Sequence, residues 1–280
     1  MTDYYLSLIL FFLFLGVLVW SIQLYLSYKK RRMLKEIDRM PFPETYRKIL
    51  NKIPHYRSLS PMDREKMERS ILRFVHLKHF LGVKMEVTDE MKVVTAFYAC
   101  LLLLHIETEN CYDNLKRVIF YPSPVIIDSV RNNGGIFTKE DFVIDGQSAN
   151  DTVVLVWHDA RKEAYHLRHD NVIIHEFAHE IDYMDGEVDG VPPLEKSRYH
   201  EWTQVLYRDF KKLNDTLINE RDWGKYKLLG SYAATNEAEF FAVVTERFFE
   251  SPHSLKRHFP ELYAELKSFY GVDPVEWVEK

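Results

Sequence analysis

The residues best suited to chemistry lie in one stretch of the chain, VIIHEFAHEID, at 172–182. It contains a His-Glu-x-x-His motif formed by His175, Glu176 and His179. On a helix, residues four apart lie on the same face, so the two imidazoles can be directed at a single point. The Glu beside that point can take a proton from a water molecule there. This pattern is typical of the active-site helix of a zinc peptidase.

The other residues of this stretch would pack the helix against the core of the protein. Its apolar side chains would cover the faces away from the histidines: Ile173, Ile174, Phe177, Ala178 and Ile181. A core helix that carries two surface histidines would show the same pattern. The metal site therefore depends on a third ligand, because catalytic zinc normally has three protein ligands and one open position.

Asp185 is one candidate for the third ligand. It lies six residues after His179, which is the spacing in His-Glu-x-x-His-x-x-Gly-x-x-(His/Asp). That arrangement needs a Gly to turn the chain back, and this sequence has Asp182 at the Gly position. The Asp185 alternative is weakened by this difference and stays open.

The segment NEAEFFAVV at 236–244 offers other candidates. Asn236 and Glu239 resemble a capping box ahead of an apolar run, so a carboxylate here would lie at the edge of the core. Glu237 and Glu239 belong to this segment and Glu246 follows it closely, and spacing alone does not choose among the three. Glu239 could equally serve only as a capping residue.

Two acidic residues could orient the ligands. Asp182 follows His179 by about one turn, and Glu246 follows Glu239 by two turns. A carboxylate at such a position can accept a hydrogen bond from a ligand imidazole and fix its tautomer. A solvated helix face would explain both residues as well.

The N-terminus has the composition of a membrane span. Residues 4–28 carry no charge, and Leu6 to Leu26 as a helix would measure roughly 30 Å, the thickness of a bilayer's hydrocarbon core. Tyrosines lie near both ends, where amphipathic rings prefer the interface. A cleaved signal peptide would have basic residues before a shorter apolar core and a small-residue site after it. The sequence therefore predicts a transmembrane anchor at 1–28.

The charges around the span predict its orientation. Lys29, Lys30, Arg31 and Arg32 follow it directly. The positive-inside rule then places the N-terminus outside and the rest of the chain in the cytoplasm, at the inner membrane. Residues 29–40 form a charged juxtamembrane linker that continues the helix or lies at the lipid headgroups.

Two prolines in three residues, Pro41 and Pro43, interrupt any helix that continues from the linker. They mark the start of a soluble domain at 41–280. The net charge of −5 gives no electrostatic case for nucleic acid as a partner. The only cysteines, Cys100 and Cys111, form no Cys-x-x-Cys pattern and suggest a reducing compartment.

The domain is expected to be α+β and mainly α. Ser60 is the N-cap candidate of one helix, and VTDE at 87–90 is expected to open another. The apolar run at 93–104 is too short for a second span. A short helix is expected at 44–53, strands at 117–121 and 152–157, and a loop around 132–135. The second strand would offer an edge with which an extended peptide could pair.

Three segments in order, HEFAHEID at 175–182, DGVPPL at 189–194 and SYAATNEAEFFAV at 231–243, resemble the Mlc titration factor A family of zinc metallopeptidases. The resemblance covers roughly residues 40–275. It implies a zincin-like fold, zinc as the cofactor, and Glu239 as the third ligand beside His175 and His179. It also implies that Tyr232 is the active-site tyrosine, whose phenol can donate a hydrogen bond to an oxyanion.

The sequence thus predicts a membrane-anchored zinc peptidase that acts on peptide or protein substrates, with Glu176 as the base and Tyr232 as the oxyanion donor. The alternative is a binding module that sequesters a transcriptional regulator, because the family is named for titrating a repressor. The anchor departs from the soluble pattern of that family and leaves substrate and partner open.

Overall fold

The computed structural model describes residues 2–106, 111–123, 151–167, 170–219 and 223–278. The chain divides into two compact units, Met1–Pro41 and Phe42–Lys280. The first unit contains one helix, α1 (Thr2–Asp38), which continues through the basic residues that follow the apolar segment. Among the described residues, α1 is the helix long and apolar enough to cross a membrane.

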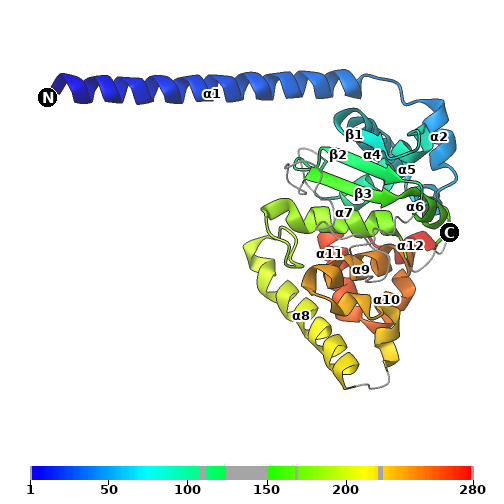
Figure 1. Ribbon diagram of the computed structural model, residues 1–280. Helices are drawn as coiled ribbons and strands as arrows, with labels where there is room; N and C mark the ends of the chain where they lie inside the picture. The colour runs from blue at the N-terminus through cyan, green and yellow to red at the C-terminus, as the bar shows by residue number, and fades with distance from the viewer. Residues whose placement is uncertain (1, 107–110, 124–150, 168–169, 220–222, 279–280) are drawn as a thin grey trace. The chain divides into compact units, whose positions relative to one another are not determined.

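The second unit is mainly helical and contains a small parallel sheet (Figure 1). In chain order its elements are α2 (Glu44–Leu50), α3 (Pro54–Ser58), α4 (Pro61–Leu77), β1 (His79–Gly82), α5 (Asp89–Leu102), β2 (Arg117–Tyr121), β3 (Thr152–Val156), α6 (Trp157–Ala164), α7 (Val172–Asp182), η3 (Tyr183–Asp185), α8 (Lys196–Ile218), η4 (Gly224–Leu228), η5 (Tyr232–Ala234), α9 (Glu237–Glu250), α10 (Pro252–His258), α11 (Pro260–Tyr270) and α12 (Val275–Val278).

The three strands lie in the order β1–β2–β3, and both pairs are parallel. Helix α5 supplies the crossover between β1 and β2 that parallel strands require. The predicted strands at 117–121 and 152–157 are confirmed, the second ending at Val156. Strand β1 was not expected, and the loop expected around 132–135 lies outside the described residues.

Helices α4 and α5 begin where the sequence predicts. Ser60 Oγ accepts a 3.1 Å hydrogen bond from the Asp63 N–H, and Thr88 Oγ1 accepts one of 3.3 Å from the Met91 N–H. Helix α5 is buried along most of its length, as expected for a core helix. The helix expected at 44–53 ends earlier, at Leu50, and α3 begins at Pro54.

Helix α7 lies between the sheet and the C-terminal helices (Figure 1). It packs against β3, α5 and α9. Phe177, at its centre, is fully buried, with its ring 5.7 Å from that of Phe74 and 5.0 Å from that of Tyr112. Burial of this apolar face holds α7 in place and leaves its histidines directed at α9.

Candidate metal centre

Helix α7 is fixed at its start by Asn171. The Oδ1 atom of Asn171 accepts a 3.2 Å hydrogen bond from the Ile174 N–H, as an N-cap does. Asn171 itself is fully buried. The first turn, which carries His175 at its end, is therefore anchored in the core.

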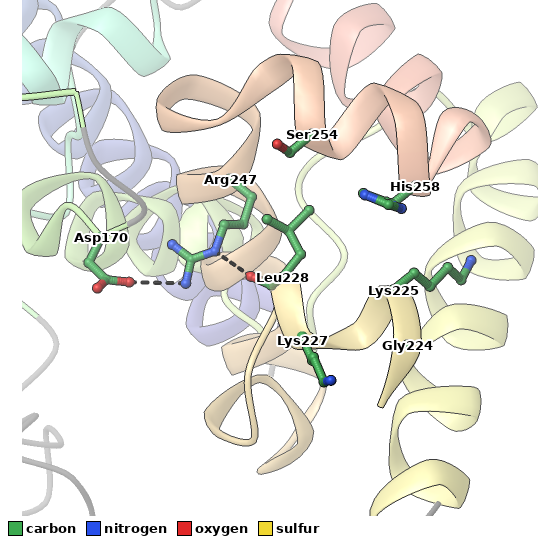
Figure 2. A pocket seen from close by; sticks show the side chains of 8 residues that line it. All are labelled: Asp170, Gly224, Lys225, Lys227, Leu228, Arg247, Ser254 and His258. Carbon is green, nitrogen blue, oxygen red and sulfur yellow. Dashed lines mark hydrogen bonds and ion pairs between the residues drawn. The ribbon is translucent and has the colours of Figure 1, made fainter. Parts of the chain in front are cut away.

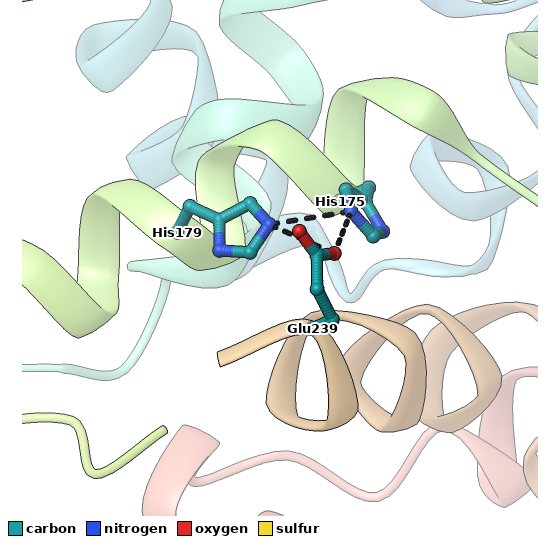
Figure 3. Close-up of side chains that lie close together, drawn as sticks. All are labelled: His175, His179 and Glu239. Atoms are coloured by element: carbon teal, nitrogen blue, oxygen red, sulfur yellow. Dashed lines mark hydrogen bonds and ion pairs between the residues drawn. The ribbon is translucent and has the colours of Figure 1, made fainter. Parts of the chain in front are cut away.

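Helix α9 begins with the predicted cap. Asn236 Oδ1 accepts a 2.9 Å hydrogen bond from the Glu239 N–H. The Glu239 side chain does not turn back to close a capping box. It points instead toward His175 and His179 on α7 (Figure 3).

The three side chains bring their donor atoms together at one point (Figure 3). Glu239 Oε2 lies 3.0 Å from His175 Nε2 and 3.4 Å from His179 Nε2, and the two Nε2 atoms lie 3.3 Å apart. Zinc bonds to nitrogen and oxygen of about 2.0–2.1 Å place neighbouring ligand atoms of a tetrahedral site about 3.3 Å apart. Two imidazoles and a carboxylate therefore fit zinc in both chemistry and spacing.

The other candidates for a third ligand lie elsewhere. Asp185 is exposed at the end of η3, where its Oδ1 accepts a 3.1 Å hydrogen bond from the Glu187 N–H. Neither Asp185 nor Glu237 belongs to the cluster of donor atoms formed within the described part of the chain. Glu246 contacts His175 through the opposite nitrogen of the ring, Nδ1.

Glu246 orients His175. The Nδ1 atom of His175 donates a 2.6 Å hydrogen bond to Glu246 Oε1, and Glu246 Oε2 accepts one of 3.0 Å from the Asn171 N–H. The proton on Nδ1 leaves Nε2 as the atom that can bind a metal. Glu246 follows Glu239 by seven residues, so the two share a face of α9. That spacing was the available sequence indication of this role.

The charges of the cluster suit a cation. Burial lowers the pKa of His175, but hydrogen bonds to Glu239 and Glu246 outweigh this and raise the pKa to about 10. Burial raises the pKa of Glu239, but hydrogen bonds from His175 and His179 hold it well below its usual range. The metal-free cluster thus retains a proton that a divalent cation would displace on binding.

Glu176 and Tyr232 lie around the cluster. Glu176 is half-buried, and burial raises its pKa, which makes its carboxylate a stronger proton acceptor than an exposed one. Tyr232, in η5, has its ring 5.8 Å from that of His175. Burial and the nearby Glu239 carboxylate raise the pKa of Tyr232, so the phenol keeps its proton and can donate it in a hydrogen bond.

Asp182 has a different partner from the one considered in the sequence. It is fully buried, and its Oδ2 accepts a 2.9 Å hydrogen bond from the Gly190 N–H. Among the described residues its Oδ1 has no hydrogen-bond partner, and burial raises its pKa to about 7. Asp182 therefore fastens the chain that follows η3.

Sequence reasoning missed a second layer of buried polar groups behind Glu246. Asn171 Nδ2 donates a 2.7 Å hydrogen bond to Glu250 Oε1, and Glu250 lies 3.8 Å from His55 Nε2. Glu250 follows Glu246 by one turn of α9, a spacing that could have indicated it. His55, far away in the sequence, gave no such indication.

Comparison with known proteins assigns this chain to a family. Residues 26–271 match the model of the glucose-regulated metallo-peptidase M90 family. The chain belongs to the M90 metallopeptidase family. Membership indicates a metallopeptidase-like domain and implies a metal, for which the cluster on α7 and α9 supplies donors.

Several curated proteins resemble this M90 chain over most of their length. An uncharacterized protein of Synechocystis sp. is 32% identical over 93% of this chain and 95% of its own. Proteins named Mlc titration factor A are similar too. That of Serratia proteamaculans is 28% identical over 79% of this chain and 86% of its own, and that of Cronobacter sakazakii is 30% identical over 80% and 84%.

Proposed function

We propose that this M90 protein is a zinc-dependent peptidase with a zincin-like domain, in which His175, His179 and Glu239 hold the ion. The observation that supports this most directly is the spacing of 3.0–3.4 Å among their donor atoms. When bound, zinc would supply Lewis acidity, which lowers the pKa of water and polarises a carbonyl.

The residues around the ligands divide the proton chemistry. Glu176 takes the proton of the attacking water and passes it to the leaving amine, as a general base and then a general acid. Tyr232, which keeps its proton, donates a hydrogen bond to the oxyanion that forms at the scissile carbonyl. Peptide and protein chains are the substrates that this pair of roles suits.

A Glu176→Gln variant of the full chain tests the activity. It should lose about 10²–10⁴-fold in peptide hydrolysis and still carry about one zinc per chain, because Gln keeps the shape of Glu but accepts no proton. Glu187→Gln, which changes an exposed carboxylate nearby, serves as the control and should keep both activity and metal. Full cleavage by Glu176→Gln would show that Glu176 is not the base.

The position of the enzyme is part of the proposal. Residues 1–28 cross the inner membrane, residues 29–40 link the span to the domain, and the domain at 41–280 faces the cytoplasm. The length and apolar character of α1 support the span, and the basic residues after it support the orientation. The protein should stay in the membrane pellet after carbonate extraction. A Thr2→Cys variant should react with an impermeant thiol reagent in intact cells.

A second function has its own support. Relatives of this chain are named Mlc titration factor A, which indicates that those proteins titrate a regulator called Mlc. By analogy the domain could sequester a transcriptional regulator, with weak or incidental cleavage. Cells that carry Glu176→Gln separate the two functions: a phenotype that survives the substitution supports binding, and a lost phenotype supports cleavage.

A further inference from the structure

A pocket of about 440 Å³ opens between η4, α9 and α10 (Figure 2). None of the residues that line it is one of the three proposed metal ligands. Its volume is within the range of small-molecule sites, which is about 300–1,000 Å³. The pocket is therefore a second place where this protein could bind a ligand.

Basic groups predominate among the described residues of the lining. Lys225, Lys227 and Arg247 carry fixed positive charges, and His258 adds an imidazole, whereas Asp170 is the acidic residue of the lining. The whole chain has a net charge of −5, so this local excess of cations runs against its overall charge. A pocket of this kind favours an anion.

Arg247 is the most constrained of these cations. It is 8% exposed, and its Nε donates a 2.7 Å hydrogen bond to the Leu228 carbonyl. Its Nη2 donates one of 3.0 Å to Asp170, whose side chain is 72% exposed (Figure 2). An ion pair with such an exposed carboxylate is weak, so an anion of higher charge can compete for the guanidinium.

Further donors come from α10. Ser254 and His258 are four residues apart, so they lie on one face of this helix, and both line the pocket (Figure 2). Neither side chain is hydrogen-bonded to another group in the described part of the chain. Lys227 reaches the pocket from η4, and Arg247 from α9. Residues of three elements, which carry hydroxyl, imidazole, ammonium and guanidinium groups, thus line one space.

We propose that this pocket binds the phosphate group of a small soluble ligand, separately from the metal centre. A phosphate has more acceptor oxygens than a carboxylate and can bond to several of these donors at once. Arg247 would offer the phosphate its Nη2, because Nε is bonded to the Leu228 carbonyl and Nη1 is buried 4.0 Å from Glu246 Oε2. Lys227 adds a positive charge to the lining. Lys225 also lines the pocket, 3.5 Å from Asp209 and 4.2 Å from the centre of the Phe259 ring.

Calorimetric titration of inorganic phosphate into the full chain in detergent micelles tests the proposal. The protein is first treated with chelator, so that phosphate cannot bind a metal, and sodium chloride holds the ionic strength constant. Saturable binding of one phosphate per chain is expected. Lys227→Ala and His258→Ala should each weaken it roughly tenfold or more, the effect of losing one hydrogen bond to a charged group.

Two controls test whether the binding is specific to the pocket and to phosphate. Lys211→Ala removes an exposed lysine of α8 that does not line the pocket, and it should leave the affinity unchanged. Acetate, titrated in the same way, should bind at least roughly tenfold more weakly than phosphate. The proposal is overturned if phosphate shows no saturable binding, if Lys227→Ala and His258→Ala both bind like the wild type, or if acetate binds as tightly.

Discussion

The Nδ1 atom of His175 donates a 2.6 Å hydrogen bond to Glu246 Oε1, and both residues are buried. Because the other oxygen of Glu246 accepts a hydrogen bond from the Asn171 N–H, one carboxylate joins the start of α7 to the middle of α9. The ring of His175 is therefore held with Nε2 toward Glu239 before any ion binds. Its metal affinity should depend on Glu246 as well as on the ligands.

Glu246→Ala should weaken zinc binding about 10–100-fold, because the Nδ1–H loses its acceptor and the ring is no longer fixed. Glu246→Gln keeps an oxygen in the same place and should have a smaller effect. Competition with a chromogenic chelator measures both affinities. Glu201→Gln on α8 changes an exposed carboxylate and should match the wild type. If Glu246→Ala also matches the wild type, Glu246 does not position the ligand.

Glu239 and Asp185, two of the candidates for the third ligand, give opposite predictions. Glu239→Ala should lower the zinc affinity by more than about 100-fold. Losing a residue that only supports a ligand costs up to about 100-fold, and losing the ligand itself should cost more. Asp185→Ala should keep full zinc content, since Asp185 lies outside the cluster of donor atoms. Metal analysis of dialysed protein compares them. Loss of zinc from the Asp185 variant alone would reverse the assignment.

Local features of the sequence predicted local features of the structure. The caps formed by Ser60 and Asn236, and the helix start at Thr88, could be predicted because each involves residues only three positions apart. Strand β1 was missed because four residues, HFLG, give too short a pattern to distinguish a strand. Its existence depends on pairing with β2, which no local pattern shows.

In the candidate site, too, the local contacts could be predicted from the sequence and the long-range contacts could not. The proximity of His175 and His179 follows from one turn of helix and could be predicted. The meeting of His175 with Glu239 and Glu246 depends on how α7 packs against α9, because these contacts span 64 and 71 residues. Spacing alone did not show which of three glutamates is the third ligand, and the family resemblance selected Glu239. The sequence offered Glu246 as a candidate for orienting a ligand, and the structure supplies its hydrogen bond with His175.

His55 should make the protein sensitive to acid. It is 3% exposed, and burial lowers its pKa to about 4, although a hydrogen bond to the Phe249 carbonyl offsets part of this effect. The unfolded chain binds a proton below pH 6.5, whereas the folded chain leaves His55 neutral down to about pH 4. The free energy of unfolding should therefore decrease as pH falls from 6.5 to 4, by up to about 3 kcal/mol.

Urea unfolding of the full chain in micelles at several pH values between 7 and 4 measures this contribution. His55→Gln removes the titrating group, so its stability should decrease less over this range, whatever its stability at pH 7. His253→Gln, at an exposed histidine, should show the pH dependence of the wild type. Equal slopes for His55→Gln and the wild type would assign the acid sensitivity to other groups.

Gly190 should be the glycine that tolerates alanine least well near the metal centre. Its φ of +80° favours glycine, and a Cβ added there would lie 2.5 Å from the Glu237 carbonyl oxygen. Its N–H donates to Asp182 and its carbonyl accepts a 3.4 Å hydrogen bond from Trp202 Nε1, so the loop at Gly190 joins α7, α8 and α9. A displacement here would strain all three contacts at once.

Gly186 provides the matched comparison, because its φ is +100° and a Cβ there would meet nothing within 4 Å. Gly186→Ala should cost about 1–2 kcal/mol of stability from the backbone conformation alone. Gly190→Ala should cost at least about 1 kcal/mol more, since the clash with the Glu237 carbonyl is added. Urea unfolding at neutral pH measures both. Equal losses would mean that the loop yields to the methyl group, and that its contact with the start of α9 contributes little to the stability of the site.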